Sequence, residues 1–408
     1  MTADSFVFNP FAPGFEADPG PAYRQLREHA PVYWWDRGQT FLLSKYDDVL
    51  AVMKDPRFSR SPRDGNNYQP VPDLPEYHDF RVASENSVFV VGAEDHLRQR
   101  RLVNAAFSPR AVEWLRQHTR DLTREALALL PDADIVDLAP AADYIPLRVI
   151  GRMLDIPATH LEGFLGFGKA RIQLLSPGLP PAVRDPLMRT VATGYSDLKG
   201  LISERRQHPG ADLLSTLIHH TDEGLKLSED ELLGLVGAII IGGSDTTVHT
   251  LRFMLLDLLR HPEQLARVRA EPGLTRAAME ETLRYDHFNR LGSPCYALED
   301  LTIRGVEIKR RQMVIPITGA GTRDPEVFER PDDFDIGRID LDKARNFGVG
   351  PHTCIGIHLA RLEIEEALPL ILERFPTMTL AGDPEFSPHF LFRVIGKLSV
   401  RVKSEASA

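Results

Sequence analysis

The sequence predicts a mainly α-helical protein with small antiparallel β-sheets, and three observations support this fold class. From Asp95 onward, apolar residues recur at helical spacing through most of the chain. One such stretch, from about Glu229 to Arg260, is long and apolar on every face at its centre, which indicates a helix that crosses the core. Alternating stretches are few and short, so no large sheet is expected. We expect a single domain over residues 1–408.

The N-terminal part of the chain mixes short elements with irregular segments. Residues 1–20 are rich in Pro, Gly and Phe and predict an extended arm on the surface. Val32–Trp35 and Thr40–Ser44 alternate on either side of Asp36-Arg37-Gly38, which predicts a β-hairpin. The polar stretch Ser59–Gly92 contains four prolines and predicts a long loop, which in a compact protein is either disordered or functional. Short helices are expected at Pro21–His29 and Asp47–Lys54.

Helical periodicity dominates the middle of the chain. A capping box, Ser228 with Glu231 three residues later, starts the long helix, and His261-Pro262 ends it. After Asp286 the pattern changes to short strands. The expected helices are His96–Ala106, Pro109–Leu130, Ile145–Leu154, Leu161–Leu175, Arg184–Gln207, Asp212–His219, Glu229–Arg260, Pro262–Arg269, Arg276–Tyr285 and Ile355–Arg374. The expected strands are Thr302–Ile303, Val306–Ile308 and Met313–Ile317, with a further strand pattern after the last helix.

Charge and composition exclude several classes of protein. The chain carries 48 basic and 58 acidic residues, a net charge of −10, which argues against a nucleic-acid-binding protein. No signal peptide is apparent, and the longest apolar run, Leu232–Gly243, has only 12 residues, so we expect a soluble cytoplasmic protein with no membrane partner. The two cysteines, Cys295 and Cys354, are too few for a disulfide framework, a zinc site or an iron–sulfur cluster. A metal bound through one cysteine therefore needs a cofactor that supplies the other ligands.

The most informative motif is Phe347-Gly348-Val349-Gly350-Pro351-His352-Thr353-Cys354-Ile355-Gly356. Its cysteine stands just before a predicted helix, whose N-terminus and dipole lower the pKa of a thiol and stabilise the thiolate. The glycines let the backbone approach a flat ligand closely. From these residues alone, a buried structural cysteine and a nucleophilic cysteine both stay open.

The complete motif resembles the haem-binding loop of the cytochrome P450 family, the haem-thiolate monooxygenases. This resemblance implies the cytochrome P450 fold, with the long helix over the haem, and haem b (iron protoporphyrin IX) as cofactor. It makes Cys354 the iron ligand, places Phe347 near the sulfur and directs His352 to a haem propionate. The positions fixed in the family's loop are matched by Phe347, Gly348, Gly350, His352, Cys354 and Gly356.

A second motif, Gly242-Gly243-Ser244-Asp245-Thr246-Thr247, lies in the middle of the long helix. Two glycines in a helix interior cost about 1 kcal/mol each, so they need a packing or functional reason. The residues alone fit either a packing notch or a widened turn with an acid–alcohol pair. The motif is similar to the oxygen-binding groove of the P450 family, which implies that Asp245 and Thr246 relay protons to bound dioxygen.

A third motif begins the helix after Asp95, where His96 and Arg100 share one face because they are four residues apart. A charge run is usually a solvated surface. Here the segment resembles the family helix whose His and Arg bind haem propionates. Arg98 and Arg101 point elsewhere and, together with Arg110 and Arg361, are predicted to form a docking surface for an electron donor.

A fourth motif, Glu281-Thr282-Leu283-Arg284, places two opposite charges on one helix face. Alone it would be read as a surface ion pair. It looks like the structural Glu-x-x-Arg of the P450 family, which implies that Glu281, Arg284 and Arg338 stabilise the fold and support the haem loop.

The resemblance predicts a bacterial-type monooxygenase that hydroxylates or epoxidises a small apolar or amphipathic organic substrate with O2. The chain lacks a dinucleotide-binding fingerprint, so the two electrons must come from outside the chain. The resemblance implies that the donor is a ferredoxin or flavodoxin with an NAD(P)H-dependent reductase. We expect a monomer. A non-catalytic haem-binding gas sensor and a peroxide-driven or isomerising haem-thiolate enzyme are the alternatives.

Family resemblance also points to the substrate pocket and to one departure from the pattern. The pocket is expected to be lined by the Ser59–Gly92 and Pro177–Pro181 segments and by Ala238, Ile241, Gly242, Leu291, Phe390 and Leu391. In the family, an Arg that pairs with a haem propionate stands where this chain has Cys295. A neutral thiol cannot balance a carboxylate, so something must compensate. The alternatives are that His96, Arg100 and His352 suffice, that Arg290 reaches in, or that water enters.

Overall fold

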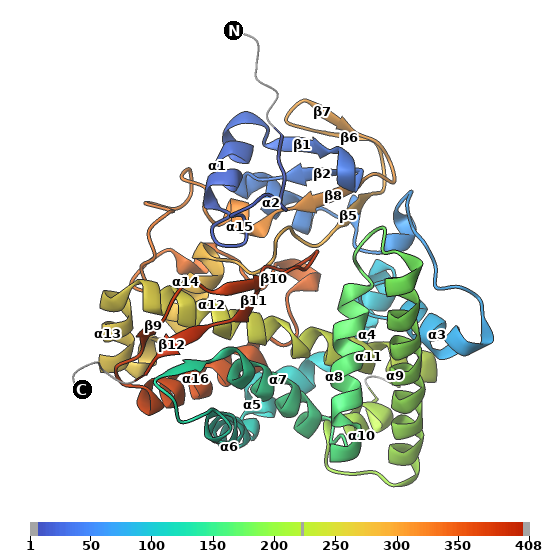
Figure 1. Cartoon of the computed structure of the whole chain (residues 1–408). Coiled ribbons are helices and arrows are strands. Elements are labelled where there is room, and N and C mark those ends of the chain that lie inside the picture. Colours follow the sequence, from blue (N-terminus) through green and yellow to red (C-terminus); the bar gives the residue numbers. More distant parts are fainter. Residues whose placement is uncertain (1–6, 222–223, 403–408) are drawn as a thin grey trace. The chain divides into compact units, whose positions relative to one another are not determined.

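The structure, a computed structural model, describes residues 7–221 and 224–402 and confirms a mainly helical protein with small antiparallel sheets (Figure 1). The chain forms two units, each assembled from segments far apart in the sequence. Unit 1 contains the residues up to 68 together with 252–354 and 379–399. Unit 2 contains 69–251, 355–378 and the residues from 400 onward. The single domain predicted over residues 1–408 stays a prediction.

Unit 1 is built on a five-stranded sheet in the order β1-β2-β8-β5-β3 (Figure 1). The predicted hairpin is confirmed, because β1 (Val32–Trp35) and β2 (Thr40–Leu43) pair antiparallel. Gln39 closes the turn between them in the left-handed region, at φ 48°. One pair in the sheet is parallel, between β2 and β8 (Met313–Pro316). The other pairs in this sheet are antiparallel.

Unit 1 contains the other strands of this sheet, further short strands and several helices. The two strands predicted at Thr302–Ile303 and Val306–Ile308 are confirmed as β6 and β7, which pair antiparallel. The other strands are β3 (Phe58–Ser59), β5 (Cys295–Ala297), β6 (Leu301–Ile303), β7 (Val306–Ile308), β9 (Thr379–Leu380), β10 (Glu385–Ser387) and β11 (Val394–Lys397). The helices are α1 (Gly20–His29), α2 (Tyr46–Lys54), α13 (Pro262–Ala270), α14 (Thr275–Tyr285) and α15 (Thr318–Gly321). Short 3₁₀ helices occur at Asp36–Gly38, Pro62–Asp64, Pro272–Leu274, Leu341–Lys343 and Gly350–His352.

The prediction that the N-terminal arm lies on the surface is wrong for its described residues, because two of its phenylalanines are buried in the core. Phe8 and Phe15 are 2% and 4% exposed and belong to a core cluster of unit 1. The buried Arg290 guanidinium forms an ion pair with Glu16 (2.9 Å) and donates to the carbonyl of Pro10. Aromatic burial and this buried cation together fix the arm in place. Residues 1–6 lie outside the described part of the chain.

Unit 2 is helical, and it contains a helix that the sequence did not predict. α3 (His78–Asn86) lies inside the segment expected to be a loop. Its backbone lies directly on α11, since a Cβ added to Gly234 would come within 2.7 Å of the Ala83 carbonyl oxygen. Phe80 also stacks on Tyr195, with ring centroids 5.8 Å apart. Tertiary packing therefore makes this polar stretch helical, although its propensity alone does not.

Most other helices of unit 2 match the predicted ones within a few residues, but α7 starts six residues before the predicted Ile145, and the helix predicted over Pro109–Leu130 is divided into α5 and α6. α6 packs against α7 and α16, while α11 packs against α3, α7, α8 and α9. The helices are α4 (Ala93–Asn104), α5 (Pro109–Val112), α6 (Leu115–Ala128), α7 (Ala139–Met153), α8 (Ala158–Gln173), α9 (Pro181–Gln207), α10 (Leu213–His219), α11 (Glu229–Ser244) and α16 (Ile357–Arg374). Unit 2 also has strand β4 (Ile135–Asp137) and 3₁₀ helices η3 (Pro75–Tyr77) and η4 (Ala105–Phe107). α12 (Thr246–Arg260) and β12 (Ser399–Arg401) have residues in both units.

The predicted long helix is present but is divided in two. Its capping box is confirmed: the Glu231 N–H donates to the Ser228 hydroxyl, and the Glu231 carboxylate accepts from the Ser228 N–H. α11 ends at Ser244 and α12 starts at Thr246. On length and composition, Glu229–Arg260 would be long and apolar enough to cross a membrane. However, 72% of its most apolar window is buried inside the protein, which is typical of a core helix.

The Glu-x-x-Arg motif forms a buried ion network in unit 1. Glu281 and Arg284 are both 0% exposed and are joined by two hydrogen bonds of 2.7 and 2.9 Å. Arg338 donates to the same Glu281 carboxylate at 3.1 Å. Arg284 also donates to the carbonyls of Thr322, Pro331 and Asp333. The three charged residues thus connect α14 with the chain that precedes the Cys354 loop.

Replacing Glu281 with Gln should strongly destabilise the protein. The change leaves the buried Arg284 and Arg338 without their balancing charge, and breaking a buried ion pair in this way costs about 3–5 kcal/mol. The free energy of unfolding in urea measures the effect. Asp333→Asn is the control, because its carboxylate pairs on the surface with Arg330 (3.3 Å), where an ion pair contributes roughly 0–1 kcal/mol. Similar losses in the two variants would contradict the prediction.

His287 should make stability depend on pH. Burial, together with the positive charge of Arg393, lowers the pKa of His287 to about 4, and its Nδ1 accepts the Asn289 N–H at 3.1 Å. The unfolded imidazole has a pKa of about 6.5, so the unfolded state binds the proton first as pH falls. Stability should therefore drop between about pH 6.5 and about pH 4, by about 3 kcal/mol from this residue. Urea denaturation of wild type and His287→Asn across that range should give parallel curves if the imidazole is not responsible.

Candidate functional site

Cys354 ends a loop that the backbone closes on itself. Its N–H donates to the carbonyl of Phe347 at 2.8 Å. Between these residues, Gly348 and Gly350 adopt φ angles of +80° and +70°, in the left-handed region. A side chain at either position would be strained, so the turn requires both glycines. The motif is therefore a rigid backbone frame around one thiol.

The chemistry around Cys354 suits a cofactor better than a bare metal ion. The Cys354 side chain is exposed. Across residues 7–221 and 224–402, no group of three or more His, Cys, Asp or Glu residues is placed to hold a metal. α16 begins three residues later, with Gly356 as its N-cap, and a helix N-terminus stabilises a nearby thiolate. A metal at this thiolate would take its remaining ligands from a cofactor.

The two glycines in the central-helix motif have different surroundings. A Cβ on Gly243 would lie 2.6 Å from Cδ1 of Ile150 in α7, so Gly243 is a packing notch. A Cβ on Gly242 would have no other atom within 4 Å, and Gly242 is exposed although it follows a run of buried residues. The packing interpretation therefore applies to Gly243, while the open space beside Gly242 fits a ligand groove.

The acid–alcohol pair lies where the helix is interrupted. Asp245 separates α11 from α12, and both Asp245 and Thr246 are half-buried. The Thr246 hydroxyl donates to the carbonyl of Gly242 at 2.9 Å, one turn earlier. The hydroxyl is thereby fixed beside the open space, with its oxygen lone pairs able to accept a further hydrogen bond.

Two of the predicted propionate ligands, His96 and Arg100, lie on α4. His96 is 3% exposed, and burial together with the positive charge of Arg100 lowers the pKa of His96 to about 4. The imidazole is therefore neutral near pH 7 and would bind a carboxylate as an N–H donor. Arg98 pairs with Asp95 (3.1 Å) and with the capping-box residue Glu231, so it ties α4 to α11 and contributes little free charge to a docking surface.

The predicted site residues divide between the two units. Leu291 and Phe390 both pack in the cluster that holds the N-terminal arm, and Ala238 is 4% exposed within α11. Unit 1 contains Leu291, Phe347, Gly348, His352, Cys354, Phe390 and Leu391. Unit 2 contains His96, Arg100, Ala238, Ile241, Gly242, Asp245, Thr246 and Gly356.

Comparison with known proteins identifies the family. The cytochrome P450 family model matches residues 195–400. The chain is 40% identical to epothilone C/D epoxidase of Sorangium cellulosum, an alignment that covers 98% of this chain and 96% of the relative. The chain belongs to the cytochrome P450 family. This P450 is also 30% identical to the polyketide biosynthesis cytochrome P450 PksS of Bacillus subtilis, over 94% of each chain. The crystal structure of epothilone D-bound cytochrome P450epoK superposes with a TM-score of 0.92 at 39% identity, covering 98% of this chain and 100% of that one.

Family membership sets the activity of this P450. It is a monooxygenase with a haem-thiolate cofactor, and it uses a small organic substrate, O2 and a redox partner. The described residues fit such a cofactor: an exposed thiol stands in a closed glycine loop, and Gly242 borders open space beside the central helix.

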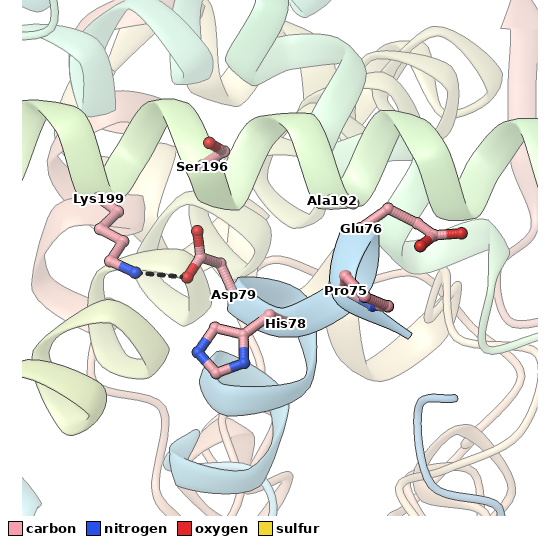
Figure 2. Close-up of a pocket in the computed structure, with 7 residues that line it drawn as sticks. All are labelled: Pro75, Glu76, His78, Asp79, Ala192, Ser196 and Lys199. Carbon is pink, nitrogen blue, oxygen red and sulfur yellow. Dashed lines mark hydrogen bonds and ion pairs between the residues drawn. The ribbon is translucent and has the colours of Figure 1, made fainter. Parts of the chain in front are cut away.

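A pocket of about 580 Å³ lies in unit 2 between the η3–α3 segment and α9 (Figure 2). Lys199 of α9 forms an ion pair with Asp79 of α3 at 2.6 Å (Figure 2). The lining is mostly polar or charged, unlike the apolar lining expected for the substrate. The part from η3 and α3 belongs to a segment predicted to line the substrate pocket, whereas the part from α9 was not predicted. The lining residues are Pro75, Glu76, His78, Asp79, Ala192, Ser196 and Lys199.

Alanine at two glycines of α11 should have opposite effects on stability. Gly242→Ala places a methyl group in open space and improves helix propensity, so stability should rise by up to about 1 kcal/mol. Gly234→Ala drives a Cβ against the backbone of Ala83 and Asn86, at 2.7 and 2.8 Å, and should cost about 1–3 kcal/mol. Urea denaturation compares them. Equal losses would show that Gly242 is also a packing notch.

Proposed function

We propose that this P450 oxidises an epothilone-like substrate, by epoxidation of a carbon–carbon double bond or by hydroxylation. The support is the 40% identity, over almost the whole of both chains, to a relative named for epothilone epoxidation. One oxygen atom of O2 enters the substrate, and the other leaves as water after taking up two electrons and two protons. The substrate is apolar or amphipathic, in keeping with the residues expected to line the pocket.

The cofactor in this proposal is haem b, held through the Cys354 thiolate. When bound, haem supplies the activation of dioxygen. The closed loop presents the thiolate, and Phe347 packs near the sulfur. Arg100 binds a propionate through charge-assisted hydrogen bonds, and the neutral imidazole of His96 donates one. His352 meets a propionate from the loop side, and Gly356 caps α16 beside the thiolate.

Thr246 and Asp245 deliver the protons in this proposal. The Thr246 hydroxyl is held by the Gly242 carbonyl at the edge of open space, so it can accept a hydrogen bond from water and orient that water as a donor. The Asp245 carboxyl replaces the proton that is consumed. Such acid–base groups typically contribute 10²–10⁴-fold to rate.

Substrate and redox partner follow from the same resemblance. We propose that the substrate contacts Ala238, Ile241, Gly242, Leu291, Phe390 and Leu391. Electrons come from a ferredoxin or flavodoxin and its NAD(P)H-dependent reductase, and the protein acts as a soluble cytoplasmic monomer. Arg101 and Arg110 are exposed and replace Arg98 as the main cations of the docking surface.

Cys354→His tests the iron ligand. The reduced carbon monoxide complex of the wild type should show the strongly red-shifted band of thiolate ligation, and the variant should lose both this band and product formation. Cys295→Ala is the matched control and should keep both, because Cys295 is buried in the sheet of unit 1. A normal thiolate band in Cys354→His would refute the assignment. Haem that is bound without NADPH-dependent turnover, in the presence of the redox partner and an epothilone, would favour a gas sensor.

Thr246→Ala tests the proton relay. Substrate binding, followed by the spectral shift, should stay nearly unchanged, while product formed per NADPH should fall by about 10²-fold as electrons are diverted to peroxide. Thr250→Ala is the control, since the Thr250 hydroxyl makes the same hydrogen bond one turn later, to the carbonyl of Thr246 (2.9 Å). If Thr246→Ala forms as much product per NADPH as the wild type, Thr246 is not a proton relay and has only a structural role.

A further inference from the structure

Cys295 stands where the family has an arginine that pairs with a haem propionate, so the proposed haem site lacks that positive charge. It is 0% exposed in β5, within a core cluster that also contains Leu43 and Val314. Burial raises the pKa of the Cys295 thiol to about 11, so the thiol is neutral near pH 7. Arg290 does not fill the gap, because its guanidinium donates to the N-terminal arm and to the turn at residues 389–392. If a cation on this sheet compensates for Cys295, it must therefore be a residue other than Arg290.

The sheet of unit 1 places another arginine directly opposite Cys295. β3 and β5 pair antiparallel, with Phe58 opposite Ala297 and Ser59 opposite Tyr296. β3 ends at Ser59, and continuing this register by one residue places Arg60 opposite Cys295. Residues opposite each other in an antiparallel pair have Cβ atoms about 4.5–5.5 Å apart and project to the same face. Arg60 is thus the nearest cross-strand position to the missing arginine.

The guanidinium of Arg60 stays beside this position. Its Nη1 donates to the carbonyl of Ser293 at 3.2 Å, and the Cys295 sulfur lies 3.9 Å from the same oxygen. The positive charge of Arg60 opposes the rise in the pKa of the Cys295 thiol that burial causes. Within the described ranges Arg60 forms no ion pair, and it is half-buried. Most of its five N–H donors are therefore available to another acceptor.

The Arg60–Cys295 position is connected to the Cys354 loop within unit 1. Met53, in the helix just before β3, packs against the cluster that contains Cys295. The Met53 methyl carbon also lies 3.7 Å from the place of a Cβ on Gly348. One side chain thus contacts both the loop that carries the thiolate and the core beneath the Arg60 strand.

We propose that Arg60 takes over the role of the missing arginine and pairs with a haem propionate. The inference rests on the proposed function, because it needs haem b bound through Cys354. In the family the cation stands at the position of Cys295, on β5. In this chain Arg60 supplies it from the end of the neighbouring strand β3, and the partner is still a haem propionate. An arginine–carboxylate pair supplies charge and up to two parallel hydrogen bonds.

The test compares Arg60→Gln with Arg57→Gln on purified holoenzyme. Arg57 is three residues earlier and carries the same charge, but it pairs with Asp55 of its own chain at 2.7 Å. Two quantities are measured: the rate of haem transfer to excess apomyoglobin, and the propionate-bending band in the resonance Raman spectrum. Arg60→Gln should speed haem loss by roughly ten-fold, as expected for losing a hydrogen bond to a charged group, and should shift the propionate band. Arg57→Gln should change neither.

Each outcome supports or overturns the inference. Arg60→Lys keeps the charge and should give a smaller increase in haem loss, which also provides a readout should Arg60→Gln fold poorly. Faster haem loss with an unchanged propionate band would assign Arg60 to the sheet and overturn the proposal, as would wild-type behaviour of Arg60→Gln. Wild-type protein that binds no haem, or binds it without the thiolate band, would instead refute the proposed function.

Discussion

Burial of opposite charges within one turn of α14 organises the approach to the Cys354 loop. Glu281 and Arg284 are both fully buried, and each can be tolerated there only because the other neutralises it. Their remaining hydrogen-bonding capacity is used on the segment that leads to the loop, through backbone carbonyls and the guanidinium of Arg338. Asn346, next to the first residue of the loop, donates to a carbonyl of the same helix at 2.9 Å. The network of Glu281, Arg284 and Arg338 therefore helps to fix the position of the loop that carries the Cys354 thiol.

Unit 2 depends on a steric constraint instead of a charge. Along α11, glycines remove side chains where a neighbour must come close: Gly234 receives the α3 backbone, Gly237 the ring of Tyr195, and Gly243 the side chain of Ile150. Gly242 has no such neighbour, although it stands in the same apolar helix. Close packing on several sides leaves one open position, and Thr246 is hydrogen-bonded to the carbonyl of that glycine. Gly243 thus serves helix packing, whereas the adjacent Gly242 borders the open space.

The role of an arginine in this acidic protein depends on the partners that its guanidinium already has. Arg98 looked like a surface charge but pairs with Glu231. Arg290 looked like a substitute propionate ligand but holds the N-terminal arm through Glu16. No sequence motif marks Arg60 as a propionate ligand, yet the β3–β5 register, continued by one residue, places it opposite Cys295. Net charge describes the whole protein, whereas recognition of a carboxylate depends on which guanidinium still has donors to offer.

Local patterns in the sequence were sufficient for the fold class, most helices, the capping box at Ser228 and the family resemblance of the Cys354 loop. These features depend on residues close together in the chain, where periodicity and motif spacing carry the physics. The helix α3 and the burial of the N-terminal phenylalanines required tertiary structure, because both depend on contacts with distant segments that outweigh local propensity. Which of two adjacent glycines borders open space, and which arginine stands opposite Cys295, were likewise decided by packing and strand register, since neither is encoded in the spacing of residues along the chain.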